Sequence, residues 1–244
     1  MIGEADRDRV RALQFHPNLS YEDFVRGWRP ASDGRLSLVD GPFLEIVQEA
    51  TYDGERTYVC VIEEINRGHP AQIFGEMLTL LEADKRRPEE ALELSYRASP
   101  DERIHIPSNL HVIGTMNIAD RSLAMVDFAL RRRFAFIDLK PEINDHWMSW
   151  VRTSHPEIKE STLREIQSRV QALNTVLAAD PTLGIQYQIG HSFITPYSEL
   201  KVGSGRQWFK QVVETEIVPL LEEYWFDAPD KVQLQRDLLV APLP

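Results

Sequence analysis

Residues 58–86 read YVCVIEEINRGHPAQIFGEMLTLLEADKR, and this stretch decides the fold. Its apolar run up to Ile62, rich in β-branched residues, predicts a central strand of a parallel sheet, buried on both faces. Beyond the acidic pair, apolar residues recur at helical spacing and predict a helix that packs on the core: Ile73, Phe74, Met77, Leu80 and Leu81. A buried strand that ends in two carboxylates and leads into a helix is therefore the central unit of the fold.

The acidic pair Glu63 and Glu64 has two readings. Most carboxylates lie in water, so the plain reading places both side chains in a solvated loop after the strand. Like charges side by side repel, however, and a carboxylate beside a buried strand costs free energy unless a positive group faces it. A fold keeps such a pair mainly where it needs the charge, which makes the pair a candidate functional site.

Local signals predict further elements on both sides of this unit. Ser20 is a candidate N-cap of a short helix, residues 31–43 (ASDGRLSLVDGPF) suggest a hairpin, and Pro42 stands where a helix starts. Residues 82–108 are polar and contain three prolines, so we expect an excursion from the core. Within it, residues 91–96 (ALELSY) suggest a second hairpin.

The second half of the chain changes from alternating strands and helices to helices alone. The predicted elements are a strand at 110–117 (LHVIGTMN), a helix at 123–130, a strand at 134–139 (FAFIDL), and long amphipathic helices at 161–180 and 207–226. Strand–helix alternation followed by helices predicts an α/β core with a helical second domain. We place the two domains at residues 1–138 and 139–244.

Composition excludes several classes of protein. The 244 residues carry a net charge of −11, which argues against this chain as the main nucleic-acid contact. No apolar run approaches the ~20 residues that cross a bilayer, and the N-terminus is too charged for a secretory signal, so we expect a cytoplasmic location without membrane contact. The single cysteine, Cys60, is expected to be a buried structural thiol. The seven histidines show no ligand spacing, so no zinc site is predicted.

Polar side chains follow two of the predicted strands. Glu63 and Glu64 end the first, and Asn117 ends the strand LHVIGTM. Ligands of open parallel sheets bind at the carboxyl ends of strands, where carboxylates can support Mg²⁺ through water and an amide can orient an attacking water. Arg131, Arg132 and Arg133 then close the helix predicted at 123–130. Cations there complement the helix dipole, but three in a row exceed that need, and a guanidinium suits a phosphate.

In this order, EEINRG, GTMNIADRSL and ALRRRF resemble the McrB-like AAA+ family, the motor subunits of modification-dependent restriction systems and GTPases of the P-loop class. FHPNLSYEDFVRGWRP and IGHSF also match segments typical of that family. The resemblance therefore covers essentially the whole chain, and it implies a partial AAA+ P-loop NTPase core followed by a helical lid domain.

The resemblance implies roles for the residues at the predicted sheet edge. Glu63 occupies the place of the Walker B acid that supports Mg²⁺, and Glu64 that of the acid that positions or deprotonates the attacking water. Asn117 occupies the sensor-1 position, and Asp120 of the same signature is expected at the nucleotide. Arg132 and Arg133 fall where the family places arginines that reach the nucleotide of the neighbouring subunit.

Two residues directly after the Walker B acids, Asn66 and Arg67, are implied to be interface or sensor residues at the nucleotide. His191 and Ser192 of IGHSF lie in the lid segment, where a fold role and a functional role remain open.

The sequence departs from the family pattern in four places. It contains no G-x-x-x-x-G-K-[ST], so the loop that cradles phosphates is absent from these residues. Because the resemblance starts just after the place of that loop, we expect a fragment or a truncated reading frame that is inactive alone. Glu63 stands where the family has aspartate, Ile118 where it has threonine, and Gln188 where it has arginine.

The resemblance implies an enzyme that, in its intact form, hydrolyses GTP or ATP in a hexameric ring. The ring would drive an McrC-like nuclease on DNA, and an N-terminal domain outside these residues would recognise the modified base. Two rivals remain: a MoxR-like or dynein-related AAA+ ATPase that acts on proteins, and a non-catalytic ring subunit. EINRG together with MNIADRSL favours the McrB-like reading over the MoxR-like or dynein-related one. The absent P-loop and Glu63 favour the non-catalytic ring subunit.

Overall fold

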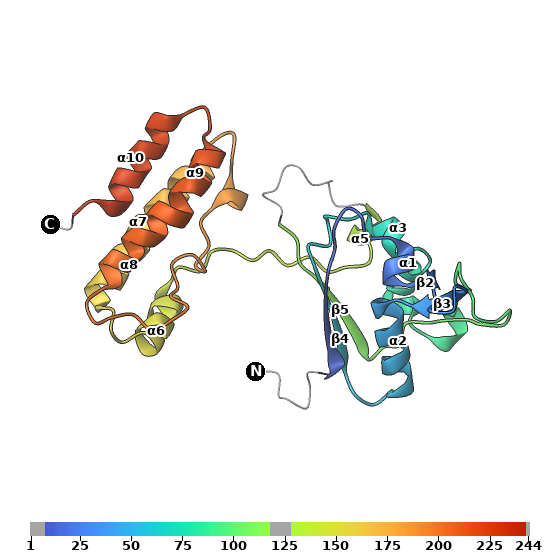
Figure 1. Ribbon diagram of the computed structural model, residues 1–244. Coiled ribbons are helices and arrows are strands. Elements are labelled where there is room, and N and C mark those ends of the chain that lie inside the picture. The colour runs from blue at the N-terminus through green and yellow to red at the C-terminus, as the bar shows by residue number, and fades with distance from the viewer. Residues whose placement is uncertain (1–7, 118–127, 243–244) are drawn as a thin grey trace. The chain divides into compact units, whose positions relative to one another are not determined.

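The computed structural model describes residues 8–117 and 128–242 of the 244-residue chain. The chain divides into two compact units, Met1–Ile137 and Asp138–Pro244 (Figure 1). The first unit combines parallel strands with helices, and the second is helical, so the predicted α/β fold followed by helices is confirmed. Within the described residues, no helix has the length and apolar character needed to span a bilayer.

Three parallel strands form the main sheet of the first unit, in the order β1 (Val10–Gln14), β4 (Tyr58–Glu63) and β5 (Leu110–Gly114). β4 is the central strand, as predicted. In its register, Ile62 lies opposite Leu13 on one side and Gly114 on the other. The carboxyl ends of all three strands consequently lie at one edge of the sheet.

Helices α1 (Tyr21–Phe24), α2 (Pro42–Tyr52) and α3 (Pro70–Phe74) lie on one side of this sheet (Figure 1). Both predicted start signals are confirmed: Ser20 accepts a hydrogen bond from the backbone N–H of Asp23 in a capping box, and Pro42 opens α2. Alternate residues of β4 are buried toward these helices, whereas Val59 and Val61 point to the other face and are partly exposed. The expected burial of β4 on both faces is therefore wrong, because the described helices cover only one.

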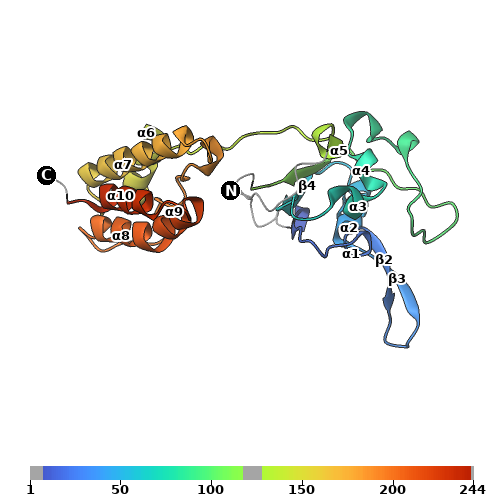
Figure 2. The same cartoon turned by 90° about the horizontal axis from the view of Figure 1, so that it is seen from above.

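The hairpin predicted around residues 31–43 is confirmed. Strands β2 (Arg26–Pro30) and β3 (Leu36–Asp40) pair antiparallel, with Trp28 opposite Leu38. Gly34 takes a φ of 77° in the turn, a conformation that glycine adopts without steric cost. Figure 2 shows this hairpin projecting from the rest of the first unit.

The apolar stripe after β4 is buried as predicted, but it lies on two short helices rather than one. α3 ends at Phe74, Gly75 takes a φ of 53°, and α4 (Met77–Leu80) follows. A Cβ at Gly75 would lie 2.8 Å from the ring of Tyr21, so the break gives that ring room. Tyr21 then donates a hydrogen bond of 2.7 Å to Glu76. Burial and this carboxylate raise the pKa of Tyr21 well above its usual value.

The excursion between α4 and β5 contains two 3₁₀ turns, Ala83–Lys85 and Pro88–Glu90. The second hairpin predicted for it is wrong, because only an isolated bridge joins Leu92 to Ile104. Ion pairs between side chains, rather than a ladder of backbone hydrogen bonds, hold the excursion in place. Arg26, which is 3% exposed, pairs with Asp40 and with Glu102, the latter at 2.7 Å. We call these three residues the polar clamp.

Predictions for residues 118–139 are confirmed only in small part. Of the predicted helix 123–130, residues 123–127 lie outside the described residues, and α5 spans Phe128–Arg131. The strand predicted at 134–139 is wrong: this segment is irregular, and Phe136, Ile137 and Leu139 are 47, 82 and 93% exposed. A run of residues with high β-propensity forms a strand only where a neighbouring strand edge can hydrogen-bond to it. The described residues provide no such edge here.

The described residues of the second unit, 138–242, form five α-helices. These are α6 (Asp145–Ser154), α7 (Glu160–Ala179), α8 (Gly205–Val212), α9 (Val218–Tyr224) and α10 (Pro229–Val240). The first predicted helix is α7. The second is α8 and α9 joined by a π-helical turn, Val213–Ile217. Asp180, which follows α7, links that helix to the C-terminal helices. Its carboxylate accepts hydrogen bonds from Trp225 of the segment after α9 and from Lys231 of α10.

Candidate functional site

The candidate site is the edge where β4 and β5 end side by side. Because the two strands are parallel and in register, the residues after Ile62 lie next to those after Gly114. Glu63 is the last residue of β4, and its backbone carbonyl accepts a hydrogen bond of 2.9 Å from Phe15, which follows β1. Its side chain is exposed, so one carboxylate is presented to solvent at this edge.

Glu64 is held in an unusual backbone conformation. Its φ is 53°, and no other non-glycine residue of the described ranges has a positive φ. Such a conformation costs a residue with a Cβ about 1–2 kcal/mol. A turn begins here, in which the N–H of Arg67 donates to the carbonyl of Glu64 at 2.8 Å. The turn therefore directs the Glu64 side chain away from the course that the strand would have given it.

The Glu64 carboxylate faces a guanidinium. Nε of Arg67 lies 3.3 Å from Oε2 of Glu64 in an ion pair, and the two side chains are 45 and 27% exposed. Oε2 is itself buried and has no hydrogen-bond partner among the described atoms. Oε2 is therefore shielded from solvent, and water meets only the rest of the partly exposed Glu64 side chain.

Asn66 joins the two strand ends from inside. Its side chain is 8% exposed, and its Nδ2 donates to the backbone carbonyl of Asn117 at 3.5 Å. Its Oδ1 is buried without a hydrogen-bond partner in the described part of the chain. Asn117 is exposed, while Asp120 lies outside the described residues. The structure thus brings Glu63, Glu64, Asn66 and Asn117 of the predicted set together at one edge, along with Arg67.

The arginines predicted to act at a nucleotide differ from one another. Arg132 follows α5 and is exposed, as is Arg131, the last residue of that helix. Arg133 is 15% exposed and pairs with Glu82 at the start of the excursion, 2.8 Å away. Arg132 is therefore directed to solvent, and Arg133 is engaged within its own unit.

Sequence reasoning missed Thr115, the first residue after β5. Its backbone carbonyl accepts from Ile65 N–H and its own N–H donates to Ile62, both at 2.9 Å. Its hydroxyl oxygen lies 3.4 Å from the N–H of Glu64 and accepts it. The available signal was a hydroxyl residue directly before Met116 and Asn117, at the end of a strand next to the acids.

A magnesium ion fits the donors at this edge. Within the described residues, no three His, Cys, Asp or Glu side chains cluster as a metal cage would need. Mg²⁺ usually keeps several waters and takes only one or two protein carboxylates, with substrate phosphates supplying the rest. The exposed carboxylate of Glu63 is of that kind.

In the helical unit, His191 is fixed from both sides of its loop. Asn174 of α7 binds Ile189 twice, through Nδ2 to its carbonyl at 3.0 Å and through Oδ1 from its N–H at 2.6 Å. Nδ1 of His191 accepts the N–H of Glu142 at 3.1 Å. The His191 ring therefore helps to close the helical unit, which gives it a fold role.

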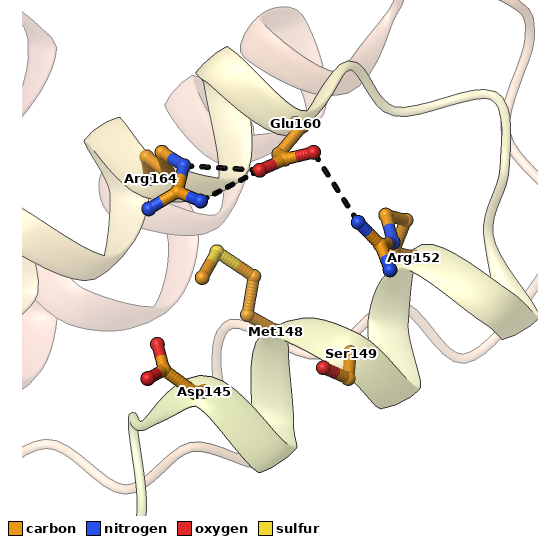
Figure 3. Close-up of a pocket in the computed structure, with 6 residues that line it drawn as sticks. All are labelled: Asp145, Met148, Ser149, Arg152, Glu160 and Arg164. Carbon is orange, nitrogen blue, oxygen red and sulfur yellow. Dashed lines mark hydrogen bonds and ion pairs between the residues drawn. The ribbon is translucent and has the colours of Figure 1, made fainter.

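A pocket lies between α6 and α7 (Figure 3). Glu160 accepts hydrogen bonds from Arg164 of its own helix at 2.7 Å and from Arg152 of α6 at 3.3 Å. Asp145 adds a second carboxylate to the lining. Two carboxylates and two guanidiniums balance each other, so the pocket has no excess charge for a phosphate.

Comparison with known families divides the chain into two parts. Residues 3–134 match the model described as AAA domain (dynein-related subfamily). Residues 165–233 match the model described as McrB, alpha-helical lid domain. The two matches fall on the α/β unit and on the helical unit, in that order.

Two relatives belong to restriction systems. The chain is 39% identical over 235 residues to the Type IV methyl-directed restriction enzyme EcoKMcrB subunit of Escherichia coli (strain K12), an alignment that covers 96% of this chain and 50% of that protein. It is 30% identical over 132 residues to the Type II restriction enzyme BsuMI component YdiS of Bacillus subtilis (strain 168), which covers 50% of this chain and 38% of the relative. The chain thus spans about half the length of the first relative and a smaller share of the second.

Proposed function

The chain belongs to the AAA family, with an AAA domain of the dynein-related subfamily followed by an McrB alpha-helical lid domain, and from this premise we propose that it is the nucleoside triphosphatase part of a DNA restriction motor. The proposed reaction is hydrolysis of GTP or ATP. The observation that carries the proposal is the meeting of Glu63, Glu64 and Asn117 at the carboxyl edge of a parallel sheet.

Each residue of this edge has a proposed task. Glu64 accepts the proton of the attacking water, because its partly exposed carboxylate side chain lies at the same strand edge as Asn117. Asn117 orients that water or the γ-phosphate, since an amide can do so without competing for the proton. Glu63 would hold Mg²⁺ through water, and a bound Mg²⁺ would supply neutralisation of phosphate charge. Asn66, Arg67 and Asp120 are proposed to contact the nucleotide or the neighbouring subunit.

The partners follow from the same family. Two relatives carry restriction-enzyme names, which supports a role in DNA restriction with a nuclease subunit of the McrC kind. We propose a hexameric ring, as the family resemblance implies, in which the exposed Arg132 would reach the nucleotide of a neighbouring subunit. The net charge of −11 supports DNA contact through the complex or another domain rather than through this chain alone.

The non-catalytic rival differs from the proposed function in whether hydrolysis depends on Glu64. Residues 3–134 match an AAA domain of the dynein-related subfamily, but an ATPase that acts on proteins is less favoured, since the lid model and the 39% identical relative both point to McrB. A non-catalytic ring subunit would keep the fold without needing an acceptor at Glu64.

The test uses a protein in which a segment carrying G-x-x-x-x-G-K-[ST] precedes these residues, termed here the P-loop-extended protein. Glu64→Gln should leave nucleotide binding and assembly unchanged and lower kcat by about 10²–10⁴, because it removes a base but little binding energy. Calorimetry, light scattering and phosphate release measure the three properties. Glu55→Gln, at an exposed glutamate of the same unit, is the matched control and should change none of them. A Glu64→Gln rate close to wild type would identify Glu64 as a loop carboxylate.

A further inference from the structure

We propose that Thr115 is a positioning residue for Glu64, acting through its hydroxyl on the strained backbone of the proposed base. The inference rests on the proposed function, since positioning matters only if Glu64 activates water. It concerns a residue outside the set predicted from the sequence, and its basis is the geometry of the Glu64–Arg67 turn.

The turn is joined to β5 by two kinds of contact. The bonds from Ile65 N–H to the Thr115 carbonyl and from Thr115 N–H to Ile62 involve backbone atoms only, so they persist whatever side chain stands at 115. The bond from Glu64 N–H to Oγ1 of Thr115, at 3.4 Å, is the one that depends on the side chain. The hydroxyl thus adds a long, solvent-exposed hydrogen bond to the peptide group between Glu63 and Glu64.

This peptide plane is one of the two that define φ of Glu64. At a φ of 53° the residue is in a conformation that a side chain with a Cβ leaves readily unless its surroundings hold it there. Removal of the hydroxyl would leave the Glu64 N–H without this acceptor and would allow the peptide to rotate. The Glu64 carboxylate would then swing relative to Asn117 and Arg67.

The consequence for catalysis is specific. A displacement of the reacting groups of about 1 Å can cost about 10² in rate, because a general base acts only from hydrogen-bonding distance. Nucleotide binding does not depend on that alignment. A positioning role for Thr115 therefore predicts a loss in kcat with little change in KM.

The kinetic experiment uses the P-loop-extended protein. Thr115→Val removes the hydroxyl at nearly constant volume and should lower kcat 10- to 100-fold with KM within about twofold. Thr115→Ser keeps the hydroxyl and should retain at least a third of the wild-type kcat. Thr51→Val, which removes a hydroxyl bonded to Val47 within α2, is the matched control and should leave both constants unchanged. Thr115→Ala serves as the hydroxyl-free variant if the valine does not fold.

A double-variant cycle shows whether Thr115 acts through Glu64. In a Glu64→Gln background, Thr115→Val should lower the residual rate less than twofold, since the group it positions is already gone. A full 10-fold loss in that background would show that Thr115 acts elsewhere and overturn the inference. Equal losses from Thr115→Ser and Thr115→Val would overturn it as well.

Amide hydrogen exchange of the 244-residue chain gives a second, activity-free measurement. Thr115→Val should speed exchange of the Glu64 amide at least 10-fold, and Thr115→Ser should leave it near wild type. Unchanged exchange in the valine variant would remove the basis of the inference. If the wild-type P-loop-extended protein hydrolyses neither GTP nor ATP, the proposed function fails and the positioning role with it. An active wild type with an equally active Thr115→Val variant overturns the positioning role alone.

Discussion

Arg133 forms an ion pair with Glu82, at 2.8 Å, while its neighbour Arg132 is exposed to solvent. The guanidinium of Arg133 is largely buried, so withdrawing it toward another subunit would leave Glu82 without this partner. Arg132 forms no such ion pair with the part of the chain that the structure describes. The two adjacent arginines, which the sequence presents as equivalent, are therefore expected to have different functions.

We predict that Arg132 acts across a subunit boundary and that Arg133 does not. In the P-loop-extended protein, Arg132→Ala should lose about 10³ in rate, as arginine fingers do. When it is mixed in equal amounts with Glu64→Gln, roughly a quarter of the interfaces in a random closed ring would combine an intact Glu64 with an intact Arg132. Partial recovery of phosphate release is therefore expected.

The matched mixtures use Arg133→Ala and Arg131→Ala. Arg133→Ala should lower thermal stability, and mixing it with Glu64→Gln should not raise phosphate release above the rate of the Arg133→Ala subunits alone. Arg131→Ala should be active alone. Recovery with Arg133→Ala but not with Arg132→Ala, in rings shown to be mixed, would reverse the assignment.

A second prediction concerns the 244-residue chain alone. It should bind GTP and ATP weakly and hydrolyse neither, because no G-x-x-x-x-G-K-[ST] is present and that loop supplies most donors to the β- and γ-phosphates. Isothermal calorimetry and phosphate release measure this directly. Micromolar affinity for either nucleotide would show that the described edge binds phosphates without such a loop.

A third prediction separates backbone strain from steric crowding at glycine. Gly34→Ala meets no atom within 4 Å and should cost only the strain of a positive φ, about 1 kcal/mol. Gly75→Ala adds a contact of 2.8 Å with the Tyr21 ring, which Glu76 holds in place, and should cost about 2–4 kcal/mol.

Unfolding of the first unit in the two alanine variants can be measured through Cys60, without a label elsewhere in the chain. It is the single cysteine, it lies fully buried on β4, and burial raises the pKa of its thiol to about 12. Pulsed reaction with a thiol reagent across a urea series should therefore follow the first unit alone. Equal midpoints for the two alanine variants would show that the Tyr21 ring moves aside.

A fourth prediction concerns acid stability of the helical unit. Hydrogen bonds from Lys231 first, and then from Thr182, lower the pKa of Asp180 well below its usual range. A carboxylate with a lowered folded-state pKa stabilises the fold above its unfolded value of about 3.9, and loses that contribution as the pH falls toward the folded value. Asp180→Asn should therefore lower the Tm at pH 7, with a difference from wild type that narrows below about pH 4. Thermal unfolding followed by circular dichroism at each pH measures the Tm, and Asp227→Asn, at an exposed aspartate, should show no difference at any pH.

Local sequence signals predicted those elements whose cause is local. Ser20 and Pro42 mark helix starts through their own chemistry, and the run ending at Ile62 is apolar enough to be central. The break at Gly75 was not predictable from spacing, since the apolar stripe continues through it, and its cause is the distant Tyr21 ring. The strand expected at 134–139 failed for the same reason, because pairing depends on an edge that the segment itself does not encode.

The candidate site shows the same division. The order of motifs predicted that Glu63, Glu64 and Asn117 follow strands, and parallel pairing brings them to one edge. Their functions remain predictions. The left-handed conformation of Glu64 and the hydroxyl of Thr115 were not predictable, because both depend on how the end of β4 meets the end of β5.

The parallel sheet also has a consequence for the order of folding. Each strand pair of the sheet joins residues about fifty positions apart, such as Val10 with Val59 and Tyr58 with Leu110, so closing either loop is entropically slow compared with forming a hairpin. The polar clamp joins Arg26 to Glu102, 76 positions apart, which is a longer loop than either strand pair, so it should close no earlier than the sheet. The β2–β3 hairpin should therefore form early, and the edge that carries Glu64 and Asn117 should be assembled among the last parts of the unit.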